Sequence, residues 1–211
     1  MKKIFVLFVF IMISLMVFSS DFGPRIPTAY FATDGTGQSD EGIPPDPYET
    51  FSYDLALLEA GIENFNVVYY TSVLPKESFE IPLKQAETYF HHGSVLECIM
   101  AKAGGYKGDT VAAGVGRVWA MDKDGNVIGG FAAEYERIYD REKVDESTAY
   151  NDAKMQLEKS LNHELSIRGL KQYGDMKFDI TSLYIEKKYG MALSALGFVN
   201  FIYPEPYPVD E

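Results

Sequence analysis

Two long β-prone segments joined by a short turn constrain the fold more than any other feature of this sequence. Thr110–Met121 and Val127–Tyr139 are rich in apolar and small residues, and the Asp-Lys-Asp-Gly-Asn stretch at 122–126 is typical of a hairpin turn. Strands connected in this way pair antiparallel. A charged segment follows, and its i+4 spacing predicts an amphipathic helix with one narrow apolar row that lies on a sheet: Ala149, Ala153, Leu157, Leu161 and Leu165.

Further strands and one further helix are predicted on either side of this hairpin. Thr28–Thr33 indicates a short strand, followed by a Gly- and Pro-rich loop over 34–47. From Tyr48 the spacing is helical, with Gly61 placed to end the helix and one apolar stripe made of Phe51, Leu55, Leu58 and Ile62. The remaining predicted strands are Asn66–Tyr70, Ser94–Ala103, Ile180–Ile185 and Met191–Ile202. Strands in runs with helices at separate points favour an α+β fold, a layered αββα sandwich with mainly antiparallel sheets, over a doubly wound parallel sheet.

Charge and cysteine content exclude several classes of function. The formal net charge of -12 argues against nucleic acid as a partner, since a phosphate-binding surface needs clustered Lys and Arg, and suits a cationic ligand better. Cys98 is the only cysteine and lies in an apolar run, which indicates core packing. His91 and His92 face opposite sides of a strand and so cannot chelate one ion, and His163 falls on the polar side of the long helix. We therefore expect no metal site.

The first twenty residues differ in composition from the rest of the chain. Lys2 and Lys3 precede an apolar run from Ile4 to Phe18, and small residues come next. This pattern is typical of a secretory signal peptide, and the run is shorter than the ~20 residues of a membrane-spanning helix. We expect an exported, periplasmic protein without a permanent membrane anchor, with residues 21–211 as a single domain. Translation from Met16 is the alternative, and the protein would then be cytoplasmic.

The glycine pairs carry no nucleotide fingerprint, and the serines carry no hydrolase fingerprint. Gly35-Thr36-Gly37, Gly114-Val115-Gly116 and Gly129-Gly130 lack the strand, turn and helix order of a phosphate-binding loop, so turns, bulges or close backbone approach explain them. No Gly-x-Ser-x-Gly elbow occurs. The notable nucleophile is instead Ser72, at the point where an Asn-x-Asn strand runs through Thr71-Ser72 towards Pro75.

Three segments in a fixed order resemble the pyruvoyl-dependent arginine decarboxylase family, and the chlamydial type most of all. They are Asp40-Glu41-Gly42-Ile43-Pro44-Pro45, Tyr69-Tyr70-Thr71-Ser72-Val73-Leu74-Pro75-Lys76-Glu77 and Gly129-Gly130-Phe131-Ala132-Ala133-Glu134-Tyr135. The resemblance covers about 27–136, and the strand at 192–201 also fits. The apolar N-terminal segment departs from the family's pattern and leaves the compartment open.

The resemblance implies that the chain cleaves itself between Thr71 and Ser72. Ser72 Oγ would attack the Thr71 carbonyl carbon, and elimination from the resulting ester would leave a β chain ending at Thr71 and an α chain that begins with a pyruvoyl group. Asn66 is the family-matched residue for this processing, as a donor to the developing oxyanion. The pyruvoyl carbonyl would then form a Schiff base with the substrate amine and accept electrons as carbon dioxide leaves.

Acidic residues take the remaining expected roles. Decarboxylation needs a general acid whose pKa is raised towards neutrality. Glu134 and Glu136 share one strand face, so periodicity cannot choose between them, and the family match favours Glu134. Asp54 matches the family's guanidinium-binding acid, since a carboxylate best holds a planar cationic fork. Asp40 and Glu41 are expected to help shape the pocket.

The resemblance therefore implies conversion of arginine to agmatine, in trimers of processed chains or in hexamers of stacked trimers. Two alternatives stay open at the level of sequence. One is a pyruvoyl decarboxylase of another amino acid, such as histidine or lysine, because the cofactor chemistry does not depend on the side chain. The other is an exported module that binds cationic metabolites without cleaving itself.

Overall fold

The computed structural model describes residues 24–140 and 144–204, which form two compact units. The larger unit spans 27–200 and contains a five-stranded sheet, a four-stranded sheet and the helices. The smaller unit includes Arg25, whose guanidinium lies 4.5 Å from the centre of the Phe201 ring. β1 (Ile26–Pro27) pairs with β11 (Phe201–Ile202). The predicted signal peptide and the alternative start at Met16 lie outside the described residues.

Two mostly antiparallel sheets make up the larger unit. The first has the order β3-β6-β10-β2-β5, in which β10 pairs antiparallel with both β6 and β2, while β3 and β5 run parallel to their neighbours at the two edges. The second has the order β4-β8-β7-β9 and is antiparallel throughout. The strands are β2 (Ala29–Ser39), β3 (Asn66–Tyr69), β4 (Val73–Pro75), β5 (Phe79–Glu80), β6 (Val95–Tyr106), β7 (Thr110–Met121), β8 (Val127–Tyr139), β9 (Lys171–Tyr184) and β10 (Tyr189–Phe198).

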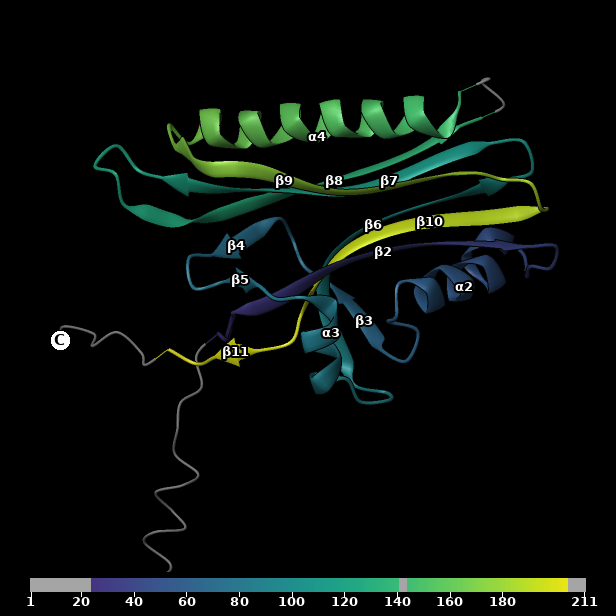
Figure 1. Ribbon diagram of the computed structural model, residues 1–211, viewed down its shortest axis with the longest axis horizontal. Coiled ribbons are helices and arrows are strands. Elements are labelled where there is room, and N and C mark those ends of the chain that lie inside the picture. The colour runs from purple at the N-terminus through teal and green to yellow at the C-terminus, as the bar shows by residue number, and fades with distance from the viewer. Residues whose placement is uncertain (1–23, 141–143, 205–211) are drawn as a thin grey trace, which may run out of the picture. The chain divides into compact units, whose positions relative to one another are not determined.

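The helices cover the outer faces of the two sheets. Figure 1 shows α4 lying along the four-stranded sheet and α2 on the far side of the five-stranded sheet, with the two sheets stacked between them. The helical elements are η1 (Pro47–Glu49), α2 (Phe51–Glu59), α3 (Leu83–Ala86), η2 (Glu87–Tyr89) and α4 (Glu146–Ile167). The predicted αββα sandwich with mainly antiparallel sheets is confirmed.

The predicted apolar row buries α4 against its sheet. All five of its members are buried, and glycines on β7 make room for two of the leucines: an added Cβ at Gly114 or Gly116 would lie 3.1–3.2 Å from Leu157 or Leu161. At the helix start the Asp145 carboxylate accepts the Thr148 N–H at 2.7 Å, as an N-cap residue does. The helix prediction held because side chains alone fill this interface.

The prediction for β2 and α2 was wrong in two respects. Residues 34–39, predicted as loop, continue β2, and the buried residues of α2 are Ser52, Ala56 and Leu57 instead of the predicted stripe, whose Phe51, Leu55 and Leu58 are exposed. A Cβ at Gly37 would lie 2.1 Å from the Ser52 carbonyl oxygen, and one at Gly35 would lie 2.3 Å from that of Ala56. The glycines therefore allow backbone-to-backbone contact, which only small helix side chains permit.

β9 is also longer than the predicted strand at 180–185. Its first half, from Lys171, pairs with the end of β7 but is largely exposed and polar, so it carries no apolar alternation for a sequence pattern to detect. β4, β5 and α3 were not predicted, since each is four residues or fewer.

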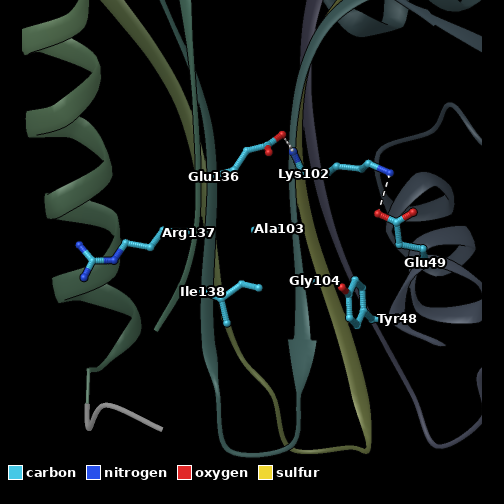
Figure 2. A pocket seen from close by; sticks show the side chains of 8 residues that line it. All are labelled: Tyr48, Glu49, Lys102, Ala103, Gly104, Glu136, Arg137 and Ile138. Carbon is cyan, nitrogen blue, oxygen red and sulfur yellow. Dashed lines mark hydrogen bonds and ion pairs between the residues drawn. The ribbon is translucent and has the colours of Figure 1, made fainter. Parts of the chain in front are cut away.

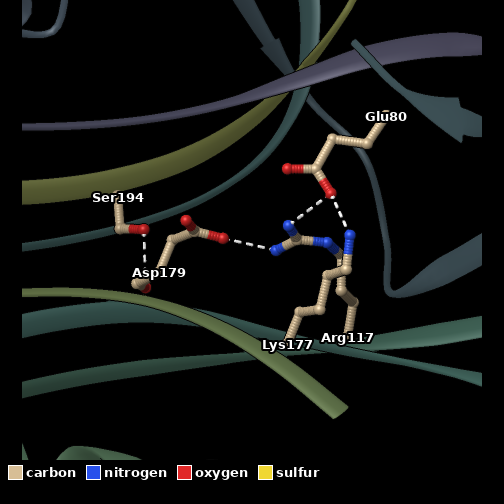
Figure 3. Close-up of polar contacts among 5 residues, drawn as sticks. All are labelled: Glu80, Arg117, Lys177, Asp179 and Ser194. Carbon is tan, nitrogen blue, oxygen red and sulfur yellow. Dashed lines mark hydrogen bonds and ion pairs between the residues drawn. The ribbon is translucent and has the colours of Figure 1, made fainter. Parts of the chain in front are cut away.

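An ionic cluster around the buried Arg117 joins the two sheets (Figure 3). Arg117 on β7 is only 2% exposed and forms ion pairs with Asp179 and, at 2.9 Å, with Glu80 on β5. Lys177 Nζ lies 2.8 Å from the same Glu80 oxygen, and Ser194 Oγ donates to the Asp179 carbonyl at 2.8 Å. Because a buried charge is costly unless it is paired, this cluster fixes β5, which follows β4 closely in the chain, against the four-stranded sheet.

Candidate active site

The segment around Thr71-Ser72 passes from one sheet to the other. β3 is an edge strand of the five-stranded sheet, and β4, which begins at Val73, is an edge strand of the four-stranded sheet. The Tyr70 N–H donates to the Cys98 carbonyl at 2.7 Å on the first sheet, and the Ser72 carbonyl accepts the Ala132 N–H at 2.9 Å on the second. Thr71 is thus the only residue between two main-chain attachments.

Ser72 and Glu134 are brought together across β4 and β8. Ser72 Oγ donates to Glu134 Oε2 at 3.0 Å and lies 3.4 Å from Oε1. The carbonyl of Thr71, immediately before Ser72, accepts the Val73 N–H at 3.1 Å. Ser72 therefore lies in a tight turn whose Val73 N–H donates to the preceding carbonyl, and its hydroxyl faces the Glu134 carboxyl group on β8.

The environment of Glu134 favours its neutral form. Desolvation raises the pKa of its carboxyl group above the usual value, and the negative charge of Glu136 raises it further, while the hydrogen bond from Ser72 acts in the opposite direction. A carboxyl group of this kind keeps its proton to higher pH than an ordinary glutamate. This is the property that a general acid needs near neutrality.

The structure shows different contacts for Glu134 and Glu136, which sequence spacing could not distinguish. Glu136 Oε1 accepts the main-chain N–H of Lys102 on β6 at 2.8 Å, while the Lys102 ammonium lies 3.1 Å from a carboxylate oxygen of Glu49 (Figure 2). These residues line a pocket of about 420 Å³ between the edges of β6 and β8. Glu136 ties the two sheets together, and only Glu134 of the pair contacts Ser72.

Asn66 and Asp54 lie apart from the junction within one chain. The Asn66 side-chain amide donates to the Gly93 carbonyl at 2.8 Å, at the opposite end of β3 from Ser72. Asp54 is exposed in the first turn of α2. Figure 1 shows α2 on the outer side of the five-stranded sheet, well separated from β4. The structure does not bring either side chain to Ser72, so their roles in processing and in guanidinium binding stay predictions.

Asp40 and Glu41 lie just beyond the end of β2 and contact neighbouring main-chain segments. The Asp40 carboxylate accepts the Lys188 N–H at 3.2 Å, and the Glu41 N–H donates to Ser39 Oγ at 3.0 Å. Ser39 pairs with Tyr189 at one end of β10, and Tyr30 pairs with Phe198 at the other end. Phe198 lies against Tyr70, next to the junction, so Asp40 and Glu41 are separated from the junction by nine residues of β10. Within one chain they do not reach Ser72.

Two features of the junction were missed at the level of sequence. The Val73 N–H is a main-chain group that no side-chain pattern reveals. Glu97 accepts a hydrogen bond from the Tyr70 hydroxyl at 2.5 Å, and its position in the apolar run from Val95 to Ile99 was the available signal, because a charged residue on a buried strand needs a partner.

The part of the chain that the structure describes shows neither a cluster of metal ligands nor a membrane-spanning helix. In 24–140 and 144–204, no three His, Cys, Asp or Glu side chains gather as metal ligands would. In the same ranges no helix combines the length and the apolar character needed to cross a bilayer. Cys98 is buried in the core cluster beneath α2, and burial raises the pKa of its thiol to about 12.

Comparison with known proteins agrees with this geometry. The sequence profile of the family described as pyruvoyl-dependent arginine decarboxylase matches residues 29–203. Pyruvoyl-dependent arginine decarboxylase AaxB of Chlamydia muridarum is 47% identical over 88% of this chain and 97% of its own length, and that of Chlamydia trachomatis serovar L2 is 49% identical over 85% and 94%. Pyruvoyl-dependent arginine decarboxylase 2 of Archaeoglobus fulgidus is 32% identical over 52% of this chain and 64% of its own. The chain belongs to the pyruvoyl-dependent arginine decarboxylase family.

Membership in this family implies a covalent pyruvoyl group, and Ser72 fits as its precursor. Its main-chain carbonyl, which would stand next to the new ketone, is already held by the Ala132 N–H. The side chain that would be converted faces the Glu134 carboxyl at 3.0 Å. The site therefore places a potential proton donor beside the atoms that would become the cofactor.

Proposed function

We propose that this protein cleaves itself between Thr71 and Ser72 and then decarboxylates L-arginine to agmatine and carbon dioxide. The observation that carries the proposal is the Ser72–Glu134 hydrogen bond at the crossing between the sheets. The names of the chlamydial and archaeal relatives support arginine as the substrate over another amino acid, and they disfavour a module that only binds cationic metabolites.

The chain's own atoms supply what the cleavage requires. Ser72 Oγ forms a bond to the Thr71 carbonyl carbon, and the bond from that carbon to the Ser72 nitrogen breaks, leaving an ester and a free amine. The ester then loses the Ser72 Cα proton and the Thr71 carboxylate, and water replaces the nitrogen, which leaves as ammonia. The Val73 N–H, 3.1 Å from the Thr71 carbonyl oxygen, stabilises the negative charge that develops there in the first step.

Decarboxylation uses the same small group of residues. The pyruvoyl group, once formed, supplies an electrophilic carbonyl that takes up the electrons released with carbon dioxide. The Ala132 N–H holds the neighbouring amide carbonyl in place. Glu134, whose carboxyl pKa desolvation raises, gives its proton to the substrate carbon that has lost the carboxylate.

Arginine recognition follows from bringing two chains together. We propose trimers, stacked as hexamers, in which α2 of one chain approaches the Ser72 edge of the next, so that Asp54 holds the guanidinium group while Glu134 serves the reacting carbon. The exposure of Asp54 and the separation of α2 from β4 within one chain (Figure 1) support such a composite site. We propose that Asp40 and Glu41 of the neighbouring chain help to shape the same pocket, and their exposure is compatible with this role.

A denaturing gel with mass spectrometry tests the cleavage. The wild-type chain is expected to give two fragments, the larger beginning at position 72 with a pyruvoyl mass and no free amine, while Ser72→Ala stays whole. Glu134→Gln is the matched control, because the glutamine oxygen still accepts the Ser72 hydrogen bond. It is expected to cleave but to lose at least about a hundredfold in decarboxylation. A single intact wild-type band would rule out the proposal.

Steady-state kinetics test the substrate site. Asp54→Ala is expected to raise the KM for arginine by at least about tenfold, because one charge-assisted contact is lost, and to leave self-cleavage unchanged. Glu63→Ala, which removes another exposed acid shortly after α2, is the control and is expected to leave the KM unchanged. An unchanged KM in Asp54→Ala would show that the guanidinium binds elsewhere.

For the compartment, we propose export with removal of the N-terminal segment, on the strength of its signal-peptide pattern. The intact mass of the smaller fragment from native cells gives its true start. A start near residue 21 supports export, and a start at Met16 supports the cytoplasm.

A further inference from the structure

Tyr70 is the last residue before the segment that changes sheets, and its main chain, ring and hydroxyl all make contacts that hold it. Its N–H donates to the Cys98 carbonyl at 2.7 Å, continuing the pairing of β3 with β6. Its ring lies against Phe198 of β10, with ring centres 5.5 Å apart. Its hydroxyl donates to Glu97 Oε2 at 2.5 Å. The main chain, the ring and the hydroxyl of this residue are thus all attached to the five-stranded sheet.

Burying the carboxyl group of Glu97 at its position costs folding free energy. Its side chain is only 9% exposed, and it lies on β6 between Leu96 and Cys98, which are in the hydrophobic core. A carboxyl group buried in this way destabilises the fold unless its oxygens are hydrogen-bonded, and the Tyr70 hydroxyl provides such a bond. A buried polar pair that an apolar pair could replace points to a role in placing Tyr70 accurately.

The position of Tyr70 determines where the Thr71 carbonyl lies. On the other side of the junction Ser72 is fixed to β8 by the Ala132 N–H and by Glu134. Only Thr71 lies between these attachments, so a movement of Tyr70 moves the Thr71 carbonyl carbon relative to Ser72 Oγ. Nucleophilic attack depends strongly on this placement, because the reacting atoms have to be held close together with the correct alignment.

We propose that Tyr70 and Glu97 are positioning residues for self-cleavage: their hydrogen bond holds the Thr71 carbonyl where Ser72 can attack it. This inference rests on the proposed self-cleavage. After cleavage the bond between Thr71 and Ser72 no longer exists, so the pair has no corresponding task in decarboxylation. The two residues are therefore expected to control the rate of maturation without controlling turnover.

The test is a time course of cleavage of the full chain after pulse-labelled cell-free translation, resolved on denaturing gels. Tyr70→Phe keeps the ring on Phe198 but removes the hydroxyl, and it is expected to slow cleavage by about tenfold, the factor that the loss of one such hydrogen bond produces. Tyr69→Phe is the matched control, because that neighbouring side chain is 50% exposed and its hydroxyl lies at the long distance of 3.4 Å from that of Tyr53. It is expected to cleave at the wild-type rate.

Variants of Glu97 give an independent measurement. Glu97→Gln retains an oxygen that accepts the phenol hydrogen bond and is expected to cleave within about threefold of wild type. Glu97→Leu is expected to be as slow as Tyr70→Phe. A role in stability alone is distinguished by two readouts: turnover per pyruvoyl group in the cleaved fraction, and the Tm of each variant in a Ser72→Ala chain. Turnover per pyruvoyl group is expected to stay close to wild type in every variant. Tyr70→Phe and Glu97→Leu each remove the hydrogen-bond partner of a buried polar group, so both are expected to lower the Tm. The double variant Tyr70→Phe/Glu97→Leu replaces the polar pair by an apolar one, and it is expected to keep a Tm close to wild type and still to cleave slowly.

The outcomes separate this inference from the proposed function. A wild-type chain that stays whole would overturn the self-cleavage itself. A wild-type chain that is cut, with Tyr70→Phe and Glu97→Leu cut at the same rate, would overturn only the positioning role. A slow cleavage accompanied by an equal loss of turnover per pyruvoyl group would also overturn it, because the pair would then act on both reactions.

Discussion

The two helices that cover the sandwich reach their sheets by different means. α4 fills the space above β7 with alanine and leucine side chains, and the glycines beneath them provide room for those leucines. α2 instead lies with its backbone directly on the backbone of β2, where Gly35 and Gly37 face Ser52 and Ala56. The first interface is stabilised by buried apolar area, and the second by close approach. The two should therefore respond to opposite kinds of substitution.

The largest expected effect comes from adding one carbon atom beneath α2. In Gly37→Ala the new Cβ would lie 2.1 Å from the Ser52 carbonyl oxygen and 2.6 Å from the Ala56 nitrogen, both of which are main-chain atoms that cannot turn away. We expect a loss of about 4 kcal/mol or more in the free energy of unfolding, measured by urea titration of the uncleaved Ser72→Ala chain. Gly116→Ala beneath α4 is the control, since its Cβ would meet only side-chain atoms, of Phe178 at 3.1 Å and of Leu161 at 3.2 Å. Equal losses in the two variants would remove the distinction between the interfaces.

A smaller effect is expected from removing side-chain volume beneath α4. Leu161 is fully buried, so Leu161→Ala should cost about 3 kcal/mol through lost apolar contact and the cavity that remains. The same urea titration measures this loss. A change below about 1 kcal/mol would mean that the helix settles onto its sheet as α2 does.

The smallest effect is expected at the matched leucine of α2. Leu58 is 57% exposed, and Leu58→Ala should change the free energy of unfolding of a single chain by no more than about 0.5 kcal/mol. Titration at a protein concentration where the chains are monomeric tests this. A loss close to that of Leu161→Ala would indicate that Leu58 is buried by the fold after all.

Sequence patterns correctly predicted the regions in which buried side chains make the packing contacts. The hairpin of β7 and β8 was predicted with its observed bounds, and so was the buried row of α4. The extension of β2 could not be predicted, because Gly35 and Gly37 read as loop residues until the helix that lies on them is known. At the site, spacing placed Glu134 and Glu136 on one face, but only the register of β4 with β8 shows which of them meets Ser72. Neither Asp54 nor Asn66 can be assigned from one chain, because no contact within it links them to the junction.

The change of sheet at Thr71 has a thermodynamic consequence for the mature protein. After cleavage the shorter fragment would keep β2, which lies between β10 and β5 of the longer fragment, and β3, which lies beside β6. Neither fragment alone would then contain all the strands of the five-stranded sheet. Folding of the mature form would become a bimolecular reaction. At concentrations where neither form assembles into trimers, its melting temperature should therefore rise with protein concentration, while that of the uncleaved chain should not. To refold after complete denaturation, β2 of the shorter fragment would have to insert between β10 and β5 of a separate longer fragment. The mature protein, unlike its uncleaved precursor, should therefore not regain its native fold readily once it has been fully denatured.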